Sequence, residues 1–268
     1  MRRIASRQNA IVARYRDAAR GRADDVMLLD GAHLVSDAVE AGVRLLEAAV
    51  AADRQDDVEV RSLVARLAAA GVEVVSVTAP VMAALSPVRS SSVFVALAVR
   101  PRQDEAALFR GARPLVVVAV DVQDPGNVGA ILRVAEAGGA AGLVVAGASA
   151  DPYGWKALRG SMGSALRLPL LVRKGAWDPA ELRRHKLRVV AAAPRDGRSL
   201  FDADLRGPVA ILVGGEGAGL PGGVLADADE RVTIPMEPGV ESLNAAVAAA
   251  LLVYEARRQR STDGGSPA

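Results

Sequence analysis

The sequence of 268 residues contains no cysteine and only two histidines, His33 and His185. The missing thiols exclude disulfide bonds, cysteine-ligated zinc and cysteine nucleophiles. Two histidines are too few for a histidine-based metal cluster and give little support to a Ser-His-Asp triad. We therefore expect a protein whose chemistry uses neither a metal nor a thiol.

Long apolar runs are also missing. The alanine-rich stretch at residues 245–253 is too short to span a bilayer. The first residues begin like a signal peptide, but no apolar segment follows them. We expect a soluble, cytoplasmic protein that does not bind membranes.

The sequence has little net charge, since Lys+Arg is 33 and Asp+Glu is 31, a formal net charge of +2. A nucleic-acid surface would therefore be a local patch. Nearly all basic residues are arginines, which suits phosphate binding and stacking on bases, although a genome rich in G and C would produce the same bias. Hydrophobic residues make up 51%, enough for a sizeable core.

Strands and helices alternate in two runs, which predicts two α/β domains. We expect a small α/β domain over residues 1–99, a polar linker over 100–113 and a second domain over 114–260. Residues 6–20 read as a basic helix, and residues 115–120 form a continuous apolar strand typical of one buried on both faces. We expect residues 261–268 to be a disordered tail.

Two loops near the end of the second domain follow apolar strands, the usual ligand-binding position in an open α/β sheet. The strand at 209–213 leads into a glycine loop, residues 214–219, that holds Glu216. Such a loop lets a flat ligand approach the backbone closely, although it could be a plain tight turn. The letters of residues 217–222 also match a dinucleotide fingerprint, but Pro221, Gly222 and Gly223 make a poor continuing helix there, so the match is weak.

The second loop follows a short strand at 231–234 and ends in Ser242-Leu243-Asn244, where a long helix begins. Ser242 is a natural N-cap for that helix, and Asn244 could point its carboxamide at a ligand. We expect the helix over 243–258 to carry an apolar stripe on one face, formed by Leu243, Val247, Leu251 and Tyr254.

Another helix, expected to end near Ala137, has Asp124 as its N-cap and Pro125 at its first position. Gly129 and Arg133 lie one turn apart on it. Glycine there costs about 1 kcal/mol relative to alanine, so it indicates a need for space. The Arg133 guanidinium could bind a phosphate, or it could be a solvated surface arginine.

Four segments together resemble the SpoU, or TrmH-like, RNA ribose methyltransferases of the SPOUT superfamily. They are DPGNVGAILR (124–133), RGSMGSALRLP (159–169), LVGGEGAGL (212–220) and IPMEPGVESLNAAVAAAL (234–251). Residues 1–95 more faintly resemble the ribosomal-protein-like RNA-binding domain that many of these enzymes carry.

The resemblance implies a SPOUT-type parallel sheet with a deep C-terminal trefoil knot, an exception to ordinary chain connectivity. It also implies a homodimer whose site is completed across the interface. S-adenosylmethionine would be bound by Gly214, Gly215, Ile234, Met236 and Leu243. Catalysis and RNA positioning would fall to Asn127, Arg133, Glu216, Ser242 and Asn244. RNA binding would use Arg2, Arg3, Arg7, Arg14, Arg16 and Arg159.

The function this resemblance implies is S-adenosylmethionine-dependent 2′-O-methylation of a ribose in RNA, with ribosomal RNA favoured by the front domain. Two alternatives stay open: a transfer-RNA 2′-O-ribose methyltransferase, and a non-catalytic RNA-binding or ribosome-assembly protein. A dinucleotide-dependent oxidoreductase is a third reading, and it depends on the weak glycine match alone.

Overall fold

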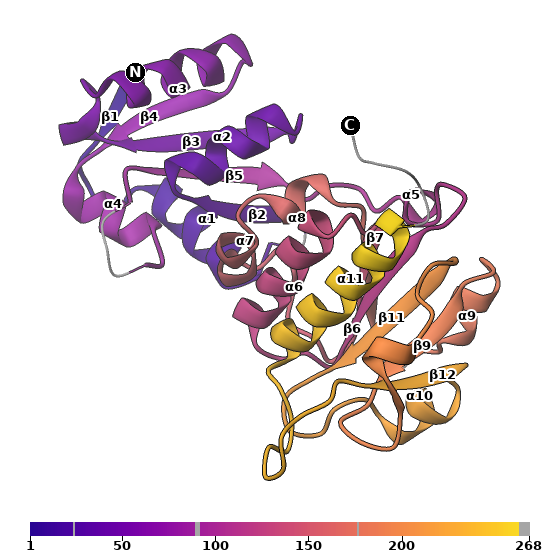
Figure 1. Ribbon diagram of the computed structural model, residues 1–268. Helices are drawn as coiled ribbons and strands as arrows, with labels where there is room; N and C mark the ends of the chain where they lie inside the picture. Colours follow the sequence, from indigo (N-terminus) through magenta and orange to yellow (C-terminus); the bar gives the residue numbers. More distant parts are fainter. Residues whose placement is uncertain (24, 89–91, 176, 263–268) are drawn as a thin grey trace. The chain divides into compact units, whose positions relative to one another are not determined.

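The computed structural model describes residues 1–23, 25–88, 92–175 and 177–262 and divides into two compact units (Figure 1). The first unit contains Met1–Arg102 and Tyr153–Arg167, and the second contains Gln103–Pro152 and the chain from Leu168 onward. The segment 153–167 thus packs with the N-terminal unit although both of its flanks belong to the second. Within the described residues, no helix is long and apolar enough to cross a membrane.

The first unit is built on a five-stranded sheet in the order β1-β4-β3-β5-β2. β5 is antiparallel to both of its neighbours, and the other pairs are parallel. The strands are β1 (Arg2–Ile4), β2 (Val26–Asp30), β3 (Leu45–Ala51), β4 (Glu73–Val77) and β5 (Phe94–Val99). β1 was not expected from the sequence, because three residues are too few to show an alternating pattern.

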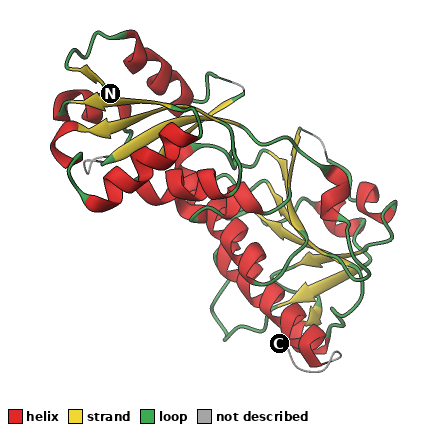
Figure 2. Ribbon diagram, turned by 90° about the horizontal axis from the view of Figure 1, so that it is seen from above, coloured by secondary structure: helices red, strands yellow, loops and turns green. Residues whose placement is uncertain are grey.

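Helices cover both faces of this sheet (Figure 2). One face is covered by α1 and α4 with a contribution from α7, and the other by α2 and α3. The elements are α1 (Ala10–Ala19), α2 (Ala32–Glu40), η1 (Ala52–Arg54), α3 (Val58–Ala69), α4 (Ala79–Leu85), α7 (Trp155–Ser161) and α8 (Ser164–Arg167). The basic helix expected over residues 6–20 is shorter than predicted because Asn9 caps its start.

The second unit is built on a seven-stranded sheet in the order β10-β12-β9-β11-β6-β7-β8, with every described strand pair parallel. The strands are β6 (Leu115–Val120), β7 (Gly142–Gly147), β8 (Leu170–Lys174), β9 (Arg188–Ala192), β10 (Arg198–Ser199), β11 (Val209–Gly214) and β12 (Glu230–Thr233). All six residues of β6 are buried, as its unbroken apolar sequence predicts.

One face of this sheet packs against α6 and α11, and apolar residues of α5, α9 and α10 pack against the other. The elements are α5 (Glu105–Leu108), α6 (Pro125–Ala137), α9 (Ala180–Arg183), η2 (Leu200–Asp202), α10 (Gly222–Ala226) and α11 (Ala245–Thr262). α6 and α11 run side by side (Figure 1). α10 was not expected, because Gly222 and Gly223 are poor helix formers.

Residues 100–113, expected to be a polar linker, contain α5, and Leu108 is completely buried. Residues 200–205, which contain η2, bury Leu200 and Leu205. Both segments are rich in charge, but their few leucines fit apolar gaps beside the sheet. Single buried residues in a polar stretch give no periodic signal in the sequence.

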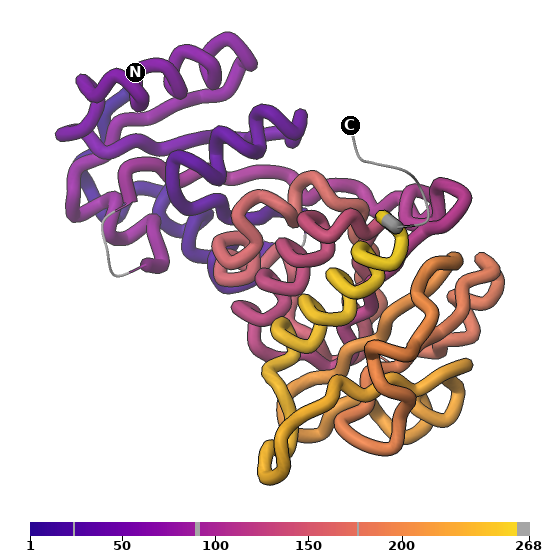
Figure 3. Tube along the Cα trace, in the orientation of Figure 1, coloured from indigo at the N-terminus to yellow at the C-terminus, as the bar shows by residue number. Residues whose placement is uncertain are grey.

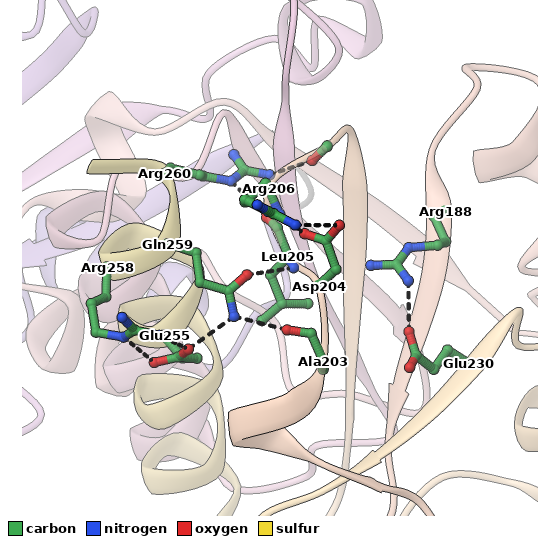
Figure 4. A network of polar contacts seen from close by, with 11 residues as sticks. Arg188, Ala203, Asp204, Leu205, Arg206, Glu230, Glu255, Arg258, Gln259 and Arg260 are labelled. Carbon is green, nitrogen blue, oxygen red and sulfur yellow. Dashed lines mark hydrogen bonds and ion pairs between the residues drawn. The ribbon is translucent and has the colours of Figure 1, made fainter. Parts of the chain in front are cut away.

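The C-terminal helix α11 is tied to the segment before β11 by a polar network (Figure 4). The Arg260 guanidinium donates to the carbonyl oxygens of Leu205 at 2.9 Å, Arg113 at 2.9 Å and Gly207 at 2.6 Å. Partial burial lowers the pKa of Arg260. α11 extends to Thr262, past the end expected at residue 258, and these hydrogen bonds hold its last turn against the fold. The remaining residues of the expected tail, 263–268, lie outside the described residues.

The apolar stripe expected on α11 faces away from the sheet. Val247, Leu251 and Tyr254 are 48%, 43% and 50% exposed. The face that packs against the unit is formed instead by residues that include Ala249, Leu252, Val253 and Ala256. An apolar face of this helix is thus uncovered in the single chain.

Candidate active site

The carboxyl ends of β6, β11 and β12 lie at one edge of the second sheet. Gly214 pairs with Val120 in the register of β11 and β6. Leu212 and Arg231 both pair with Ala191 of β9, so Gly215 and Ile234 lie at the same level on either side of β9. At the usual strand spacing they are about 10 Å apart.

Only glycine fits at the start of the loop after β11. A Cβ on Gly214 would lie 2.2 Å from the carbonyl carbon of Gly219, and a Cβ on Gly215 would lie 2.1 Å from the carbonyl oxygen of Asp121. The loop folds back on itself, since the Gly219 N–H donates to the Gly215 oxygen at 3.2 Å. Close packing of backbone therefore explains these glycines.

Asp121 is a site-forming residue that the sequence reading did not single out. It follows β6 with a φ of 56°, and its side chain accepts a hydrogen bond from the Ala148 N–H at 2.7 Å. Its carbonyl abuts Gly215. The sequence feature that could have identified Asp121 is its position as a polar residue directly after a buried strand.

Three predicted catalytic residues meet in one chain of hydrogen bonds. Asn127 donates its side-chain N–H to the Glu216 carboxylate, and Asn244 donates to the Asn127 Oδ1 at 3.1 Å. Asn127 lies in the first turn of α6, where its N–H bonds the Asp124 side chain at 2.9 Å. Asp124 is therefore the N-cap that the sequence predicts. The structure thus joins residues that are 89 and 117 positions apart.

Asn244 also caps α11. Its Oδ1 accepts from the backbone N–H of Ala246 at 2.9 Å and of Val247 at 3.3 Å. The sequence offered Ser242 as the N-cap, and that reading is wrong because the helix begins two residues later than a Ser242 cap requires. Ser242 is exposed.

Arg133 is exposed on α6 and forms no hydrogen bond or ion pair within the described part of the chain. Gly129, one turn before it, is buried. This fits the expectation that a glycine inside this helix indicates a need for space. The structure does not bring Arg133 into the hydrogen-bonded trio. Its guanidinium is left open to a ligand or to another chain.

The loop after β12 and the segment before α11 place three apolar side chains near this edge. Ile234, Met236 and Leu243 are each half-buried, whereas the loop residues 237–242 between them are exposed. Figure 3 shows this segment as a long loop between β12 and α11. Half-buried apolar surface in an exposed loop is suited to the flat face of a ligand.

The arginines predicted to bind RNA fall into three groups in the first unit. Arg2 pairs with Glu73 at 3.1 Å, and Arg14 pairs with Glu47. Arg7 and Arg16 line a cavity. Arg3 and Arg159 are exposed and form no ion pair within the described residues. Two of the six arginines are thus already neutralised by carboxylates.

Glu47 and Tyr15 form a buried polar pair beneath Arg14. Burial raises the pKa of Glu47, and Arg14 opposes that shift. Burial, followed by the charge of Glu47, raises the pKa of Tyr15 well above its ordinary value. Arg14 thus stabilises a carboxylate inside the fold.

The site's donor set suits an organic cofactor. Among the described residues, no group of three or more His, Cys, Asp or Glu side chains could hold a metal ion. What gathers at the sheet edge is exposed backbone, half-buried apolar side chains and a few amides. These groups fit a nucleoside with a short polar chain, such as S-adenosylmethionine.

The fold and the site define an α/β protein with a parallel sheet and a glycine-rich binding edge. The chain belongs to the SpoU rRNA Methylase family, whose model matches residues 114–254. The resemblance drawn from the four sequence segments is confirmed.

Relatives cover nearly the whole chain. An uncharacterised tRNA/rRNA methyltransferase of Synechocystis is 34% identical over 96% of this chain and 94% of its own length. The 23S rRNA (guanosine(2553)-2′-O)-methyltransferase RlmP of Bacillus subtilis is 28% identical over 87% of this chain and 89% of its own length.

Solved structures agree with this assignment. The SpoU methyltransferase AviRb of Streptomyces viridochromogenes, in complex with its cofactor AdoMet, matches with a TM-score of 0.85 and 30% identity over 94% of this chain and 98% of its own. An AdoMet-bound rRNA methyltransferase of Sinorhizobium meliloti matches with a TM-score of 0.81 and 26% identity over 96% and 97%.

Proposed function

We propose that this protein transfers a methyl group from S-adenosylmethionine to a ribose 2′-hydroxyl in RNA, with ribosomal RNA as the favoured substrate. The observation that carries the proposal is the hydrogen-bonded trio Asn127, Glu216 and Asn244 beside a glycine loop. It lies in a chain of the SpoU rRNA Methylase family. Relatives that are ribosomal RNA 2′-O-methyltransferases favour this substrate over transfer RNA.

The cofactor is held by the backbone around Gly214 and Gly215 and by Ile234, Met236 and Leu243. The tight folding of the glycine loop and the half-buried apolar side chains support this assignment. When bound, the cofactor supplies an electrophilic methyl group on a sulfonium. The absence of a Cβ at Gly215 lets the loop pack on Asp121, and this fixes the wall of the site.

The protein's own residues orient and activate the ribose hydroxyl. A neutral hydroxyl is a poor nucleophile, so its proton must be shared or lost as it attacks. Asn127 and Asn244 are positioned by hydrogen bonds on either side, and we assign them to orient the RNA together with Glu216 and Ser242. Arg133 binds the adjacent phosphate and stabilises negative charge that develops on the 2′-oxygen. A guanidinium stays protonated in proteins, so Arg133 is not the general base.

The role of Arg133 predicts a graded loss of activity. Arg133→Lys keeps a positive charge and should retain part of the methyl-transfer rate, whereas Arg133→Ala should lose at least about 100-fold. Single-turnover assays with radiolabelled cofactor and saturating RNA measure the rates. If the lysine variant is as inactive as the alanine variant while RNA binding is intact, charge stabilisation is not the role of Arg133.

Three further features belong to this proposal. The protein is a homodimer that uses the uncovered face of α11, and the exposure of Val247, Leu251 and Tyr254 supports this. The chain that returns from β12 to α11 passes through a loop as a trefoil knot, and the non-sequential strand order supports that topology. The N-terminal unit binds RNA, and the enzyme acts in the cytoplasm, where ribosomal RNA is found.

Two measurements test the proposed function. Calorimetry should detect binding of S-adenosylmethionine to the purified protein, and its absence would exclude a methyltransferase. Mapping of 2′-O-methyl positions in total RNA, with and without the gene, should show one ribosomal position that depends on it. A dependent position in transfer RNA would select the transfer-RNA alternative, and cofactor binding with no dependent position would favour a non-catalytic RNA-binding protein.

A further inference from the structure

The first unit contains a cavity of about 320 Å³ between α1, the end of α4 and the start of α7. Three of its lining residues are arginines, Arg7, Arg16 and Arg20, and none is an acid. Trp155 of α7 lines it as well. A cavity of this size holds one small organic group rather than a single ion.

The arginines of this cavity are not used by the fold. Within the described residues, the side chains of Arg7, Arg16 and Arg20 form no ion pair or hydrogen bond, whereas the nearby Arg2, Arg14 and Arg22 each pair with an acid. Arg16 and Arg20 are four residues apart, so they lie on one face at the end of α1. Three unneutralised guanidiniums repel one another, and an anion in the cavity would relieve that repulsion.

Apart from Ser86, the rest of the wall is apolar, and it includes one aromatic ring. Ala84, Leu85 and Pro87 line it beside Trp155, which is half-buried and packs against the core of the unit. The Lys156 ammonium lies 5.6 Å from the centroid of a Trp155 ring and adds positive charge. An indole held by the core loses little conformational freedom when a flat group packs on it.

We propose that this cavity binds one unpaired nucleotide of the RNA substrate, with its phosphate on the arginines and its base against Trp155. This inference rests on the proposed function, since it assigns a recognition site for the same substrate. Proteins read RNA mainly at unpaired nucleotides, whose bases stack on aromatic rings and on guanidiniums. A base that is stacked between its neighbours in a helix has no free face to pack against Trp155.

Trp155 lies in the segment 153–167, which belongs to the first unit, and it packs against the core of that unit. It is contributed by chain that interrupts the second unit in sequence, and it completes a cavity whose arginines come from the N-terminal residues. The recognition site therefore depends on both parts of the sequence. It is separate from the trio around Asn127, so its variants should leave cofactor binding intact.

The test uses the full-length protein and compares a single-stranded oligoribonucleotide with a duplex of the same composition. Arg16→Ala/Arg20→Ala and Trp155→Ala should each weaken binding of the single strand by about 10-fold or more, because stacking and phosphate contacts are of that size. The double variant should also reduce the salt slope of log K by about 0.7, since the proposal places one phosphate on these arginines and each phosphate contact on a single strand contributes about 0.7. Arg66→Ala, an arginine on α3 that pairs with Glu40, is the matched control.

Fluorescence gives a second readout. The sequence has two tryptophans, so Trp177→Phe leaves Trp155 as the only indole. Single-stranded RNA and adenosine monophosphate should quench it, and inorganic phosphate should not. Quenching by neither nucleotide probe, or full RNA affinity in both cavity variants, would overturn the proposal even if the protein binds S-adenosylmethionine. Absence of cofactor binding, measured separately by calorimetry, would instead overturn the proposed function.

Discussion

Asn244 joins the fold to the candidate site. Its oxygen caps α11 while its amino group donates to Asn127, so one side chain fixes both the start of the helix and the geometry of the trio. Glu216 and Asn127 are both at the surface or close to it, which leaves them open to a substrate. Because its oxygen and its amino group have different partners, Asn244 can be substituted so that only one of these two hydrogen bonds is lost.

Substitutions of Asn244 should separate stability from activity. Asn244→Asp keeps the capping oxygen but not the donor, so it should hold the melting temperature and lower the methyl-transfer rate by at least about 10-fold. Asn244→Ala should also lose about 1 kcal/mol of stability with the cap. Thermal unfolding and single-turnover assays on both variants provide the comparison. Equal rates in the aspartate variant and the wild type would remove the trio from the mechanism.

The glycine loop makes a separate prediction. A methyl group at Gly215 would overlap the carbonyl of Asp121, so Gly215→Ala should shift the loop and abolish measurable cofactor binding. Gly217→Ala is less crowded, because its Cβ would meet nothing within 4 Å, although its φ of 85° still strains an alanine. Calorimetric titration of both proteins should show a larger loss for Gly215→Ala, and the reverse order would contradict the packing argument.

At the scale of elements, α1 presents two kinds of arginine. Arg14 lies over the buried Glu47 of β3, while Arg16 opens onto the cavity. Burial raises the pKa of Glu47, so the folded state holds its proton more tightly than the unfolded state. On this helix Arg14 thus pairs with a carboxylate of the fold, whereas Arg16 forms no ion pair within the described residues.

The Glu47 carboxyl should make stability depend on pH. Its stabilising contribution is fully present below its unfolded pKa of about 4.5 and is lost as the pH rises through the raised folded pKa. Glu47→Gln should remove this decline, and Arg14→Ala should move it to higher pH because the opposing cation is gone. Urea unfolding between about pH 4 and pH 8 gives the three curves. Parallel curves for the wild type and Glu47→Gln would show that Glu47 does not titrate in this range.

At the scale of the whole molecule, α11 carries an apolar face that the single chain leaves uncovered. Leu251→Glu or Tyr254→Glu should give a monomer with little change in melting temperature, since neither side chain is buried in the chain itself. Activity should fall by at least about 10-fold if the site is completed across the dimer. Light scattering coupled to gel filtration, with the exposed Val58→Glu as control, tests this. A wild-type protein that is already monomeric would exclude the proposed dimer.

The sequence predicted the elements whose signal is local. The strand at 115–120, the cap at Asp124 and the α/β class with a parallel sheet all follow from apolar runs and capping residues within about ten positions. The family could also be recognised, because its motifs are short and ordered. Asp121 and α5 were missed, because their contacts are with neighbours far along the chain. The cap at Asn244 was missed although its hydrogen bonds are local, because Ser242, two residues earlier, is an equally favourable capping residue.

The sequence by itself determined the two α/β runs and the glycine loop, because those depend on backbone preferences and hydrophobic pattern. Its short motifs also identified the family, and the proposed site residues follow from that resemblance. Only the tertiary structure decided which of these residues meet. Asn127, Glu216 and Asn244 are joined by hydrogen bonds although they are far apart in the sequence. Trp155 lies in a segment that packs with the first unit, whereas the chain on both sides of that segment belongs to the second. Contacts of that kind arise when strands pair and faces are buried, and no pattern confined to one segment encodes them.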